Sequence, residues 1–115
     1  MNHHIEDPQN LVTLILRNIR LENVSGDYHK MLKKLGAYEN KMASKSCWII
    51  DFTDERELAE ILRQLQELGF LFVGIEPAGW SPADIFENLR GKHLVSGHVK
   101  EIRWRGPGDW FITER

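Results

Sequence analysis

The chain has 115 residues, of which 42% are hydrophobic and 28% are charged, and its net charge is −2. This size and balance predict a single globular domain over residues 1–115 with a frayed N-terminus at residues 1–6, and they exclude a disordered tail. A single cysteine, Cys47, excludes an internal disulfide, and the lack of a long apolar run or a signal-like N-terminus predicts a cytoplasmic protein.

The first predicted element is a helix that begins at Asp7 and Pro8, a pair that is typical of a helix N-cap and first turn. In a helix, the apolar residues between positions 11 and 19 would cover more than half of the circumference. Such a helix must be buried or covered by a partner, so we expect that a homodimer could form through it. A buried strand over LVTLIL is the alternative.

A second helix is predicted over DYHKMLKKLG, where apolar residues recur at helical spacing and Gly36 marks the end. The polar sequence ENKMASKS, residues 39–46, indicates a connecting loop. The two N-terminal helices would therefore precede the first strand.

The clearest pattern in the chain is a strand, a helix and a second strand. SCWIIDF is rich in residues that favour strands, and Thr53 or Asp54 caps the amphipathic helix that follows it. Gly69 ends this helix, and FLFVGIE indicates another buried strand. We predict a βαβ unit whose two strands are parallel and joined by a right-handed connection.

The last third of the chain predicts a helix and a hairpin. Ser81 and Pro82 begin the helix, which ends at Gly91. Two strands, at about residues 98–104 and 110–113, flank a Gly-Pro-Gly tip that suits a type II turn. The predicted fold class is α/β: a small mixed sheet, made of the parallel βαβ unit and the C-terminal antiparallel hairpin, with the element order α-α-β-α-β-α-β-β.

One candidate site follows from the parallel strands, because ligands of open α/β sheets bind beyond the carboxyl ends of such strands. The polar and aromatic residues expected there are Asp51, Asp54, Glu76, Trp80 and Ser81. Its three carboxylates could hold Mg²⁺, and such a site would make the chain a small-molecule or Mg-dependent enzyme. Helix capping explains the Asp and Ser residues as well, and no phosphate-binding glycine loop or metal-ligand spacing is present. We therefore expect no catalytic residue, metal or cofactor.

The hairpin is the stronger candidate for a binding surface. Alternation along a strand places Ile102 and Trp104 on one face, and Arg103 and Arg105 on the other. Tryptophan and arginine are the residue types most enriched at binding hot spots. The candidate partner-binding residues are Arg90, Lys92, Lys100, Arg103, Trp104, Arg105 and Trp110.

The segment from residue 89 to the C-terminus, LRGKHLVSGHVKEIRWRGPGDWFITER, resembles the closing part of a winged-helix domain, with a helix end followed by a two-stranded basic wing. The resemblance implies phosphate contacts by Arg90, Lys92, Arg103 and Arg105, and a base contact by Asn88. It covers only the last quarter of the chain, and FLFVGIE predicts a strand where a winged helix requires a helix. We therefore do not assign the chain to that family.

These patterns together predict a small non-catalytic binding protein that occupies a surface of a protein partner, as an accessory, inhibitory or regulatory factor. Nucleic-acid binding through the basic segment 90–105 and an enzyme site at the strand ends are the two alternatives. No membrane partner is expected.

Overall fold

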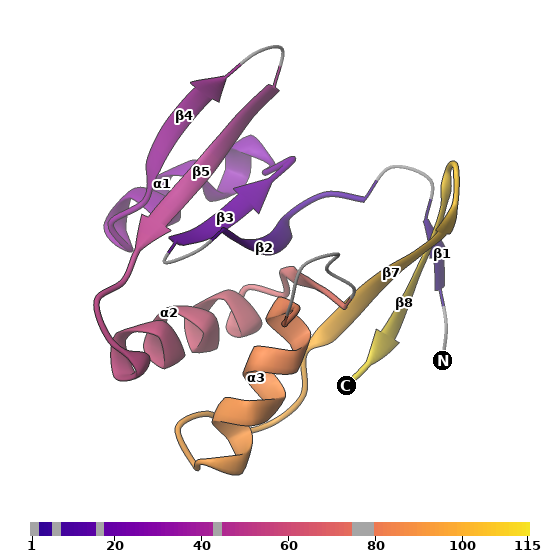
Figure 1. Cartoon of the computed structure of the whole chain (residues 1–115). Helices are drawn as coiled ribbons and strands as arrows, with labels where there is room; N and C mark the ends of the chain where they lie inside the picture. The colour runs from indigo at the N-terminus through magenta and orange to yellow at the C-terminus, as the bar shows by residue number, and fades with distance from the viewer. Residues whose placement is uncertain (1–2, 6–7, 16–17, 43–44, 75–79) are drawn as a thin grey trace.

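The computed structural model describes residues 3–5, 8–15, 18–42, 45–74 and 80–115 (Figure 1). These residues form a mixed sheet with the strand order β1-β8-β7-β6-β2-β3-β5-β4, together with three α-helices. The strands are β1 (His3–Ile5), β2 (Leu11–Ile15), β3 (Asn18–Glu22), β4 (Tyr38–Met42), β5 (Lys45–Asp51), β6 (Leu71–Val73), β7 (Lys100–Gly106) and β8 (Asp109–Glu114). The helices are α1 (His29–Lys34), which follows the 3-10 turn η1 (Gly26–Tyr28), α2 (Glu55–Glu67) and α3 (Pro82–Gly91). The predicted α/β class with a mixed sheet is confirmed, whereas the predicted element order is wrong.

The largest error is the predicted N-terminal helix. Its apolar run forms the antiparallel pair β2 and β3 instead, so the strand alternative was correct. Val12 and Ile19 are fully buried against the helices. The homodimer expected through this segment was argued from a helix that does not form, and it stays a prediction. His3–Ile5, which we expected to fray, pairs with β8 as strand β1.

The predicted loop at residues 39–46 is also wrong in most of its length. Tyr38–Met42 forms the edge strand β4, which pairs antiparallel with β5. Polar side chains are tolerated there because an edge strand faces solvent along one side. The short helix α1 before it is as predicted, and Gly36 adopts a φ of +88°, the left-handed conformation that ends helices.

The unit β5-α2-β6 has the predicted parallel strands but not as neighbours. β3 is antiparallel to both β2 and β5, and β6 is parallel to β2, so β5 and β6 run in the same direction. β2 and β3 lie between them in the sheet. α2 is capped as predicted, since the Asp54 side chain accepts a hydrogen bond of 2.8 Å from the backbone N–H of Glu57.

A second βαβ unit, β6-α3-β7, has adjacent parallel strands and leads into the predicted hairpin. Gly106 pairs with Asp109 across the tip, and Gly108 has a φ of +68°. Proline followed by a glycine with positive φ is the arrangement of a type II turn, as predicted. The register shifts between Trp104 and Gly106, which leaves Arg105 as a bulge.

All three helices pack on one face of the sheet and enclose the main core (Figure 1). A row of paired residues crosses this face from Trp48 through Leu21, Val12 and Phe72 to Glu101. The opposite face carries a smaller cluster around Leu11, Leu71 and Ile102, with Val73, Trp110 and Ile112 packed against it. Among the described residues, no helix has the length and apolarity to cross a membrane.

Candidate functional site

The start of α3 is built by local sequence. The Ser81 hydroxyl accepts a hydrogen bond of 3.1 Å from the backbone N–H of Asp84, and the Asp84 carboxylate accepts one of 3.3 Å from the N–H of Ser81. This reciprocal capping box fixes the first turn, and Pro82 stands where its missing N–H costs nothing. Asp84 and Glu87, three residues apart, therefore lie on one flank of the helix.

Glu101 is the unexpected feature beneath this helix end. It continues the apolar row next to Phe72, and its side chain is only 4% exposed. A buried carboxylate is costly unless it is paired. Arg103 Nε donates to it at 3.1 Å and Arg115 Nη1 at 2.5 Å. Gly74 provides the space, because a Cβ at that position would lie 2.5 Å from Glu101 Oε2.

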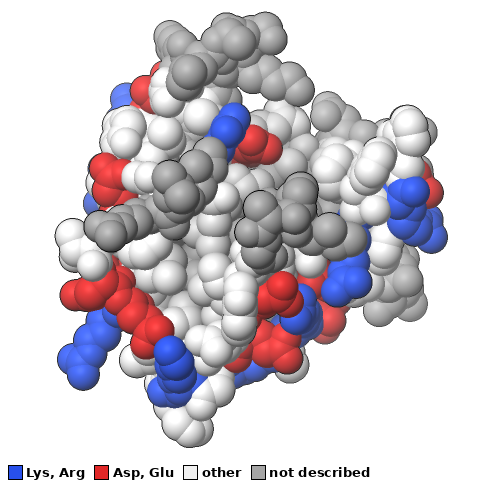
Figure 2. Space-filling view, in the orientation of Figure 1, with Lys and Arg blue, Asp and Glu red and all other residues white. Residues whose placement is uncertain are grey.

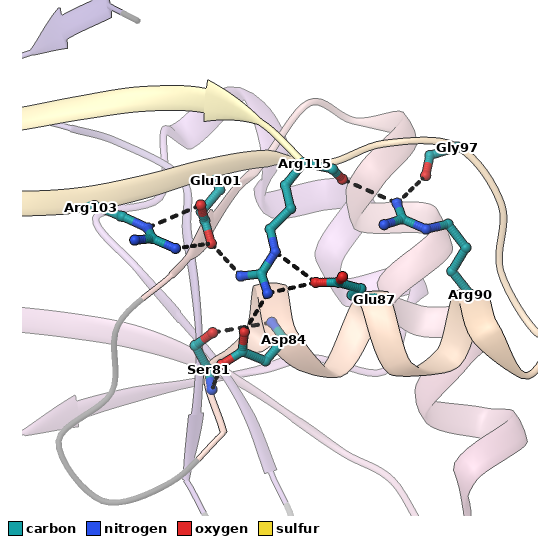
Figure 3. A network of polar contacts seen from close by, with 8 residues as sticks. All are labelled: Ser81, Asp84, Glu87, Arg90, Gly97, Glu101, Arg103 and Arg115. Carbon is teal, nitrogen blue, oxygen red and sulfur yellow. Dashed lines mark hydrogen bonds and ion pairs between the residues drawn. The ribbon is translucent and has the colours of Figure 1, made fainter.

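Arg115 connects this buried carboxylate to α3 (Figure 3). Its Nη2 lies 2.6 Å from both Asp84 Oδ1 and Glu87 Oε2. Burial lowers the pKa of the Arg115 guanidinium, but the hydrogen bonds to its three carboxylates outweigh burial and raise the pKa above its ordinary value. The same contact with Arg115 holds the pKa of Asp84 below its ordinary value.

The main chain of Arg115 is held as firmly as its side chain. Its N–H donates to the Val99 carbonyl at 2.9 Å, and Arg90 Nη1 donates to its carbonyl at 3.1 Å. Arg90 also donates to the Gly97 carbonyl at 2.7 Å (Figure 3). Figure 2 shows the outcome on the surface, where acidic and basic side chains lie side by side at the junction of α3 and the hairpin.

An open cavity of about 630 Å³ lies beside this network. It is lined by Trp80, Asp84, Glu87, Asn88 and Arg115. The Trp80 residue is 62% exposed, although it directly precedes the capped helix end. The cavity thus combines an accessible aromatic surface with carboxylate, amide and guanidinium groups.

The hairpin separates its tryptophans from its arginines, as alternation predicts. Trp104 pairs with Trp110 across the two strands on the face opposite the helices. Trp110 packs against the smaller apolar cluster, whereas Trp104 is 54% exposed. One tryptophan is therefore structural and the other is accessible.

The candidate basic residues do not form one patch. Arg103 is bound to buried Glu101, and Arg105 lies 3.1 Å from Asp109 and 4.7 Å above the centre of the Phe111 ring. Lys92, at the far end of α3, forms an ion pair of 2.7 Å with Glu55 of α2. Lys100 is exposed at the base of the hairpin.

The residues expected to share a crevice at the strand ends do not come together either. Asp51 accepts hydrogen bonds from the side chains of Asn18 and Tyr38, and Asp54 caps α2. β5 and β6 are three strand spacings apart, about 14 Å. The cavity that Trp80 lines has no contribution from Asp51. Glu76 lies outside the described residues.

Sequence reasoning missed the residues that define the cavity, Asp84, Glu87 and Arg115, and missed Glu101. Two signals were present. The S-x-x-D pattern at the helix start places Asp84 beside its N-terminus, and alternation places Glu101 on the same side of β7 as buried Val99.

The described residues contain no group of three or more His, Cys, Asp or Glu side chains placed to hold a metal ion. Asn88, to which the winged-helix resemblance assigned a base contact, lines the cavity. Comparison of the chain with protein-family models, with curated proteins and with solved structures finds no match in any of the three.

Proposed function

We propose that this protein is a small non-catalytic binding protein that occupies the surface of a protein partner through the outer face of the β7–β8 hairpin. The observation that carries the proposal is Trp104, an indole that is 54% exposed beside an apolar cluster of the open sheet face. Tryptophan is among the residue types most enriched at the hot spots of protein interfaces.

The hairpin offers a defined surface for such an anchor. Trp104 lies on a strand that is paired with β8, and an indole has only two side-chain rotations for binding to order. Lys100 is exposed at the base of β7 and shares the face of Ile102 and Trp104. A matching partner would have an apolar recess with an acidic group at its border.

The two alternatives have weaker support. Arg90, Lys92 and Arg103, which a nucleic-acid binder would turn toward phosphates, donate to acceptors of their own chain. Two of the carboxylates expected in an enzyme site have other roles: Asp54 caps α2, and Asp51 accepts a hydrogen bond from Asn18. The experiment below distinguishes nucleic-acid binding from protein binding by nuclease treatment.

The test compares the immobilised full chain with its Trp104→Ala variant in an extract of the organism that encodes it. A protein captured by the wild type is purified, and its affinity for each variant is measured by calorimetry. We expect Trp104→Ala to weaken binding at least about 30-fold, the effect typical of an interface hot spot. The thermal midpoint should stay close to that of the wild type, because the side chain is half exposed.

Trp80→Ala is the matched control, since Trp80 is also exposed but lies at the cavity on the other side of the sheet. It should leave the affinity for this partner unchanged. Capture that survives the loss of Trp104, or that disappears after nuclease treatment, contradicts the proposal. The second result would identify a nucleic acid as the bound species.

A further inference from the structure

The cavity beside α3 is a second site, separate from the hairpin face. Trp80 provides an accessible aromatic surface on one of its walls, and Asn88 provides an amide that can accept a hydrogen bond. Arg115 and the two acids of α3 complete the lining. We propose that this cavity binds an organic cation, a guanidinium or alkylammonium group, against the Trp80 ring.

The charge of the cavity lining favours a cation. The lining contains two carboxylates, Asp84 and Glu87, and one guanidinium group, Arg115, so its formal sum is −1. An anion entering the cavity would approach an excess of negative charge, whereas a cation would restore neutrality.

A free acceptor points to the same ligand class. Both contacts between Arg115 and Glu87 are to Oε2, at 2.6 Å and 2.9 Å, so Oε1 remains available to a further donor within the described part of the chain. Glu101, by contrast, is buried and uses both of its oxygens on its two arginines. The incoming cation therefore finds its carboxylate partner in Glu87, on the outer flank of α3.

The aromatic wall explains why the cation would be organic. A guanidinium or ammonium group over an indole face is attracted by the negative charge of the ring face, and its carbon atoms gain apolar contact. A bare metal ion gains nothing from the indole and requires several oxygen ligands.

The site and the hairpin surface are independent. Glu101, over which the network forms, faces the helix layer, whereas Trp104 shares the opposite face with Ile102. Failure of either proposal therefore leaves the other standing.

The test is an NMR titration of the ¹⁵N-labelled full chain that follows the indole N–H signals of the four tryptophans. N-acetylarginine amide represents a polypeptide side chain, spermidine represents a free polyamine, and N-acetylcitrulline amide is the uncharged isostere of the first probe. We expect the Trp80 signal to shift with at least one cation and to respond at least about tenfold more weakly to citrulline. The cation that binds more tightly shows whether the ligand group belongs to a polypeptide side chain or to a free polyamine.

Two variants locate the site. Trp80→Ala should weaken the binding of the cation by about 2- to 30-fold, the range of cation–π contributions. Glu87→Gln should also weaken the binding of the cation. The control variant is Glu39→Gln, which neutralises an exposed acid on the distant edge strand β4 and should leave the affinity unchanged. If neither cation binds the wild type more tightly than citrulline amide does, or if the affinity for the bound cation is unchanged in Trp80→Ala, the proposal is overturned. The comparison of probes on the wild type decides the question even if a variant fails to fold.

Discussion

Glu101 and Gly74 act as one unit at the scale of single residues. The carboxylate occupies space that any side chain at position 74 would fill, since a Cβ there would lie 2.6 Å or less from three of its atoms. The same carboxylate holds Arg103 and Arg115. A glycine whose role is to leave room is invisible to sequence periodicity, and so is the partner that it admits.

We expect Gly74→Ala to lower the free energy of unfolding by about 1–3 kcal/mol, because overpacking would displace the paired carboxylate. Glu101→Ala should cost about 1–3 kcal/mol on its own by leaving two arginines short of an acceptor. Urea unfolding of both variants and of the double variant forms the measurement. The double variant should be more stable than the sum of the single changes predicts, because removing the Glu101 side chain creates the space that the methyl group added at position 74 needs. Strict additivity would show that the two residues are not coupled.

Arg103 illustrates the limit of sequence reasoning at the same scale. Alternation correctly placed it on the face opposite Trp104. Periodicity gives the face of a side chain but not its partner, so an arginine committed to buried Glu101 looked like a free contact residue. Asp51 is a similar case, because its hydrogen bonds with Asn18 and Tyr38 became visible only with the structure.

At the scale of elements, α3 depends on an acid that serves two purposes. Asp84 accepts from the N–H of Ser81 and binds Arg115, and these contacts hold its pKa below the ordinary value. A carboxyl whose pKa is lowered by folding stabilises the protein above its unfolded pKa of about 3.9. That contribution is lost as the pH falls through the lower, folded pKa.

We therefore expect Asp84→Asn to reduce stability at pH 7 by about 1 kcal/mol, a value typical of a partly exposed cap and ion pair. The difference between wild type and variant should shrink as the pH is lowered from about 5 toward about 2. Urea unfolding across this range provides the measurement. A difference that stays constant with pH would show that the charge of Asp84 contributes nothing to the helix end.

The elements that the sequence predicted well are those whose signals are local. α2 and α3 have a capping residue, an apolar stripe and a terminal glycine or lysine within one segment, and the hairpin has its Gly-Pro-Gly turn. The pair β2 and β3 has no such local signals. Its apolar run is covered on one side by helices that come later in the chain, so the reason for its burial lies outside the segment. In a helix or in a strand, that run would be equally apolar, and only the rest of the molecule decides between them.

At the scale of the whole molecule, the strand order separates interior strands from edges. β2 and β3 are paired on both sides, whereas β1 and β4 are paired on one side only. Nothing in the chain's periodicity encodes this order, so the sequence predicted that β5 and β6 are parallel but not which strands lie beside them. The βαβ rule gave their common direction but not the two strands inserted between them.

Hydrogen exchange should report the difference between these strands. We expect the paired amides of β2 and β3 to exchange only through global unfolding, and those of β1 and β4 to exchange at least about tenfold faster through local opening. Mass spectrometry of peptic fragments, or NMR of individual amides, would measure the rates. Protection of β1 equal to that of β2 would mean that the sheet opens as one unit up to its edge.

The position of β6 between β2 and β7 also sets the order of events during translation. When β5 emerges from the ribosome at Asp51, one side of β2 still has no neighbour, and that neighbour begins only at Leu71. β1 waits longer, since its partner residues Trp110 to Ile112 belong to β8, which follows all the other described strands. At a synthesis rate of about 5–20 residues per second, β1 stays unpaired for about 5–20 s. A nascent chain of this protein therefore offers chaperones a bare strand until β8 has been made.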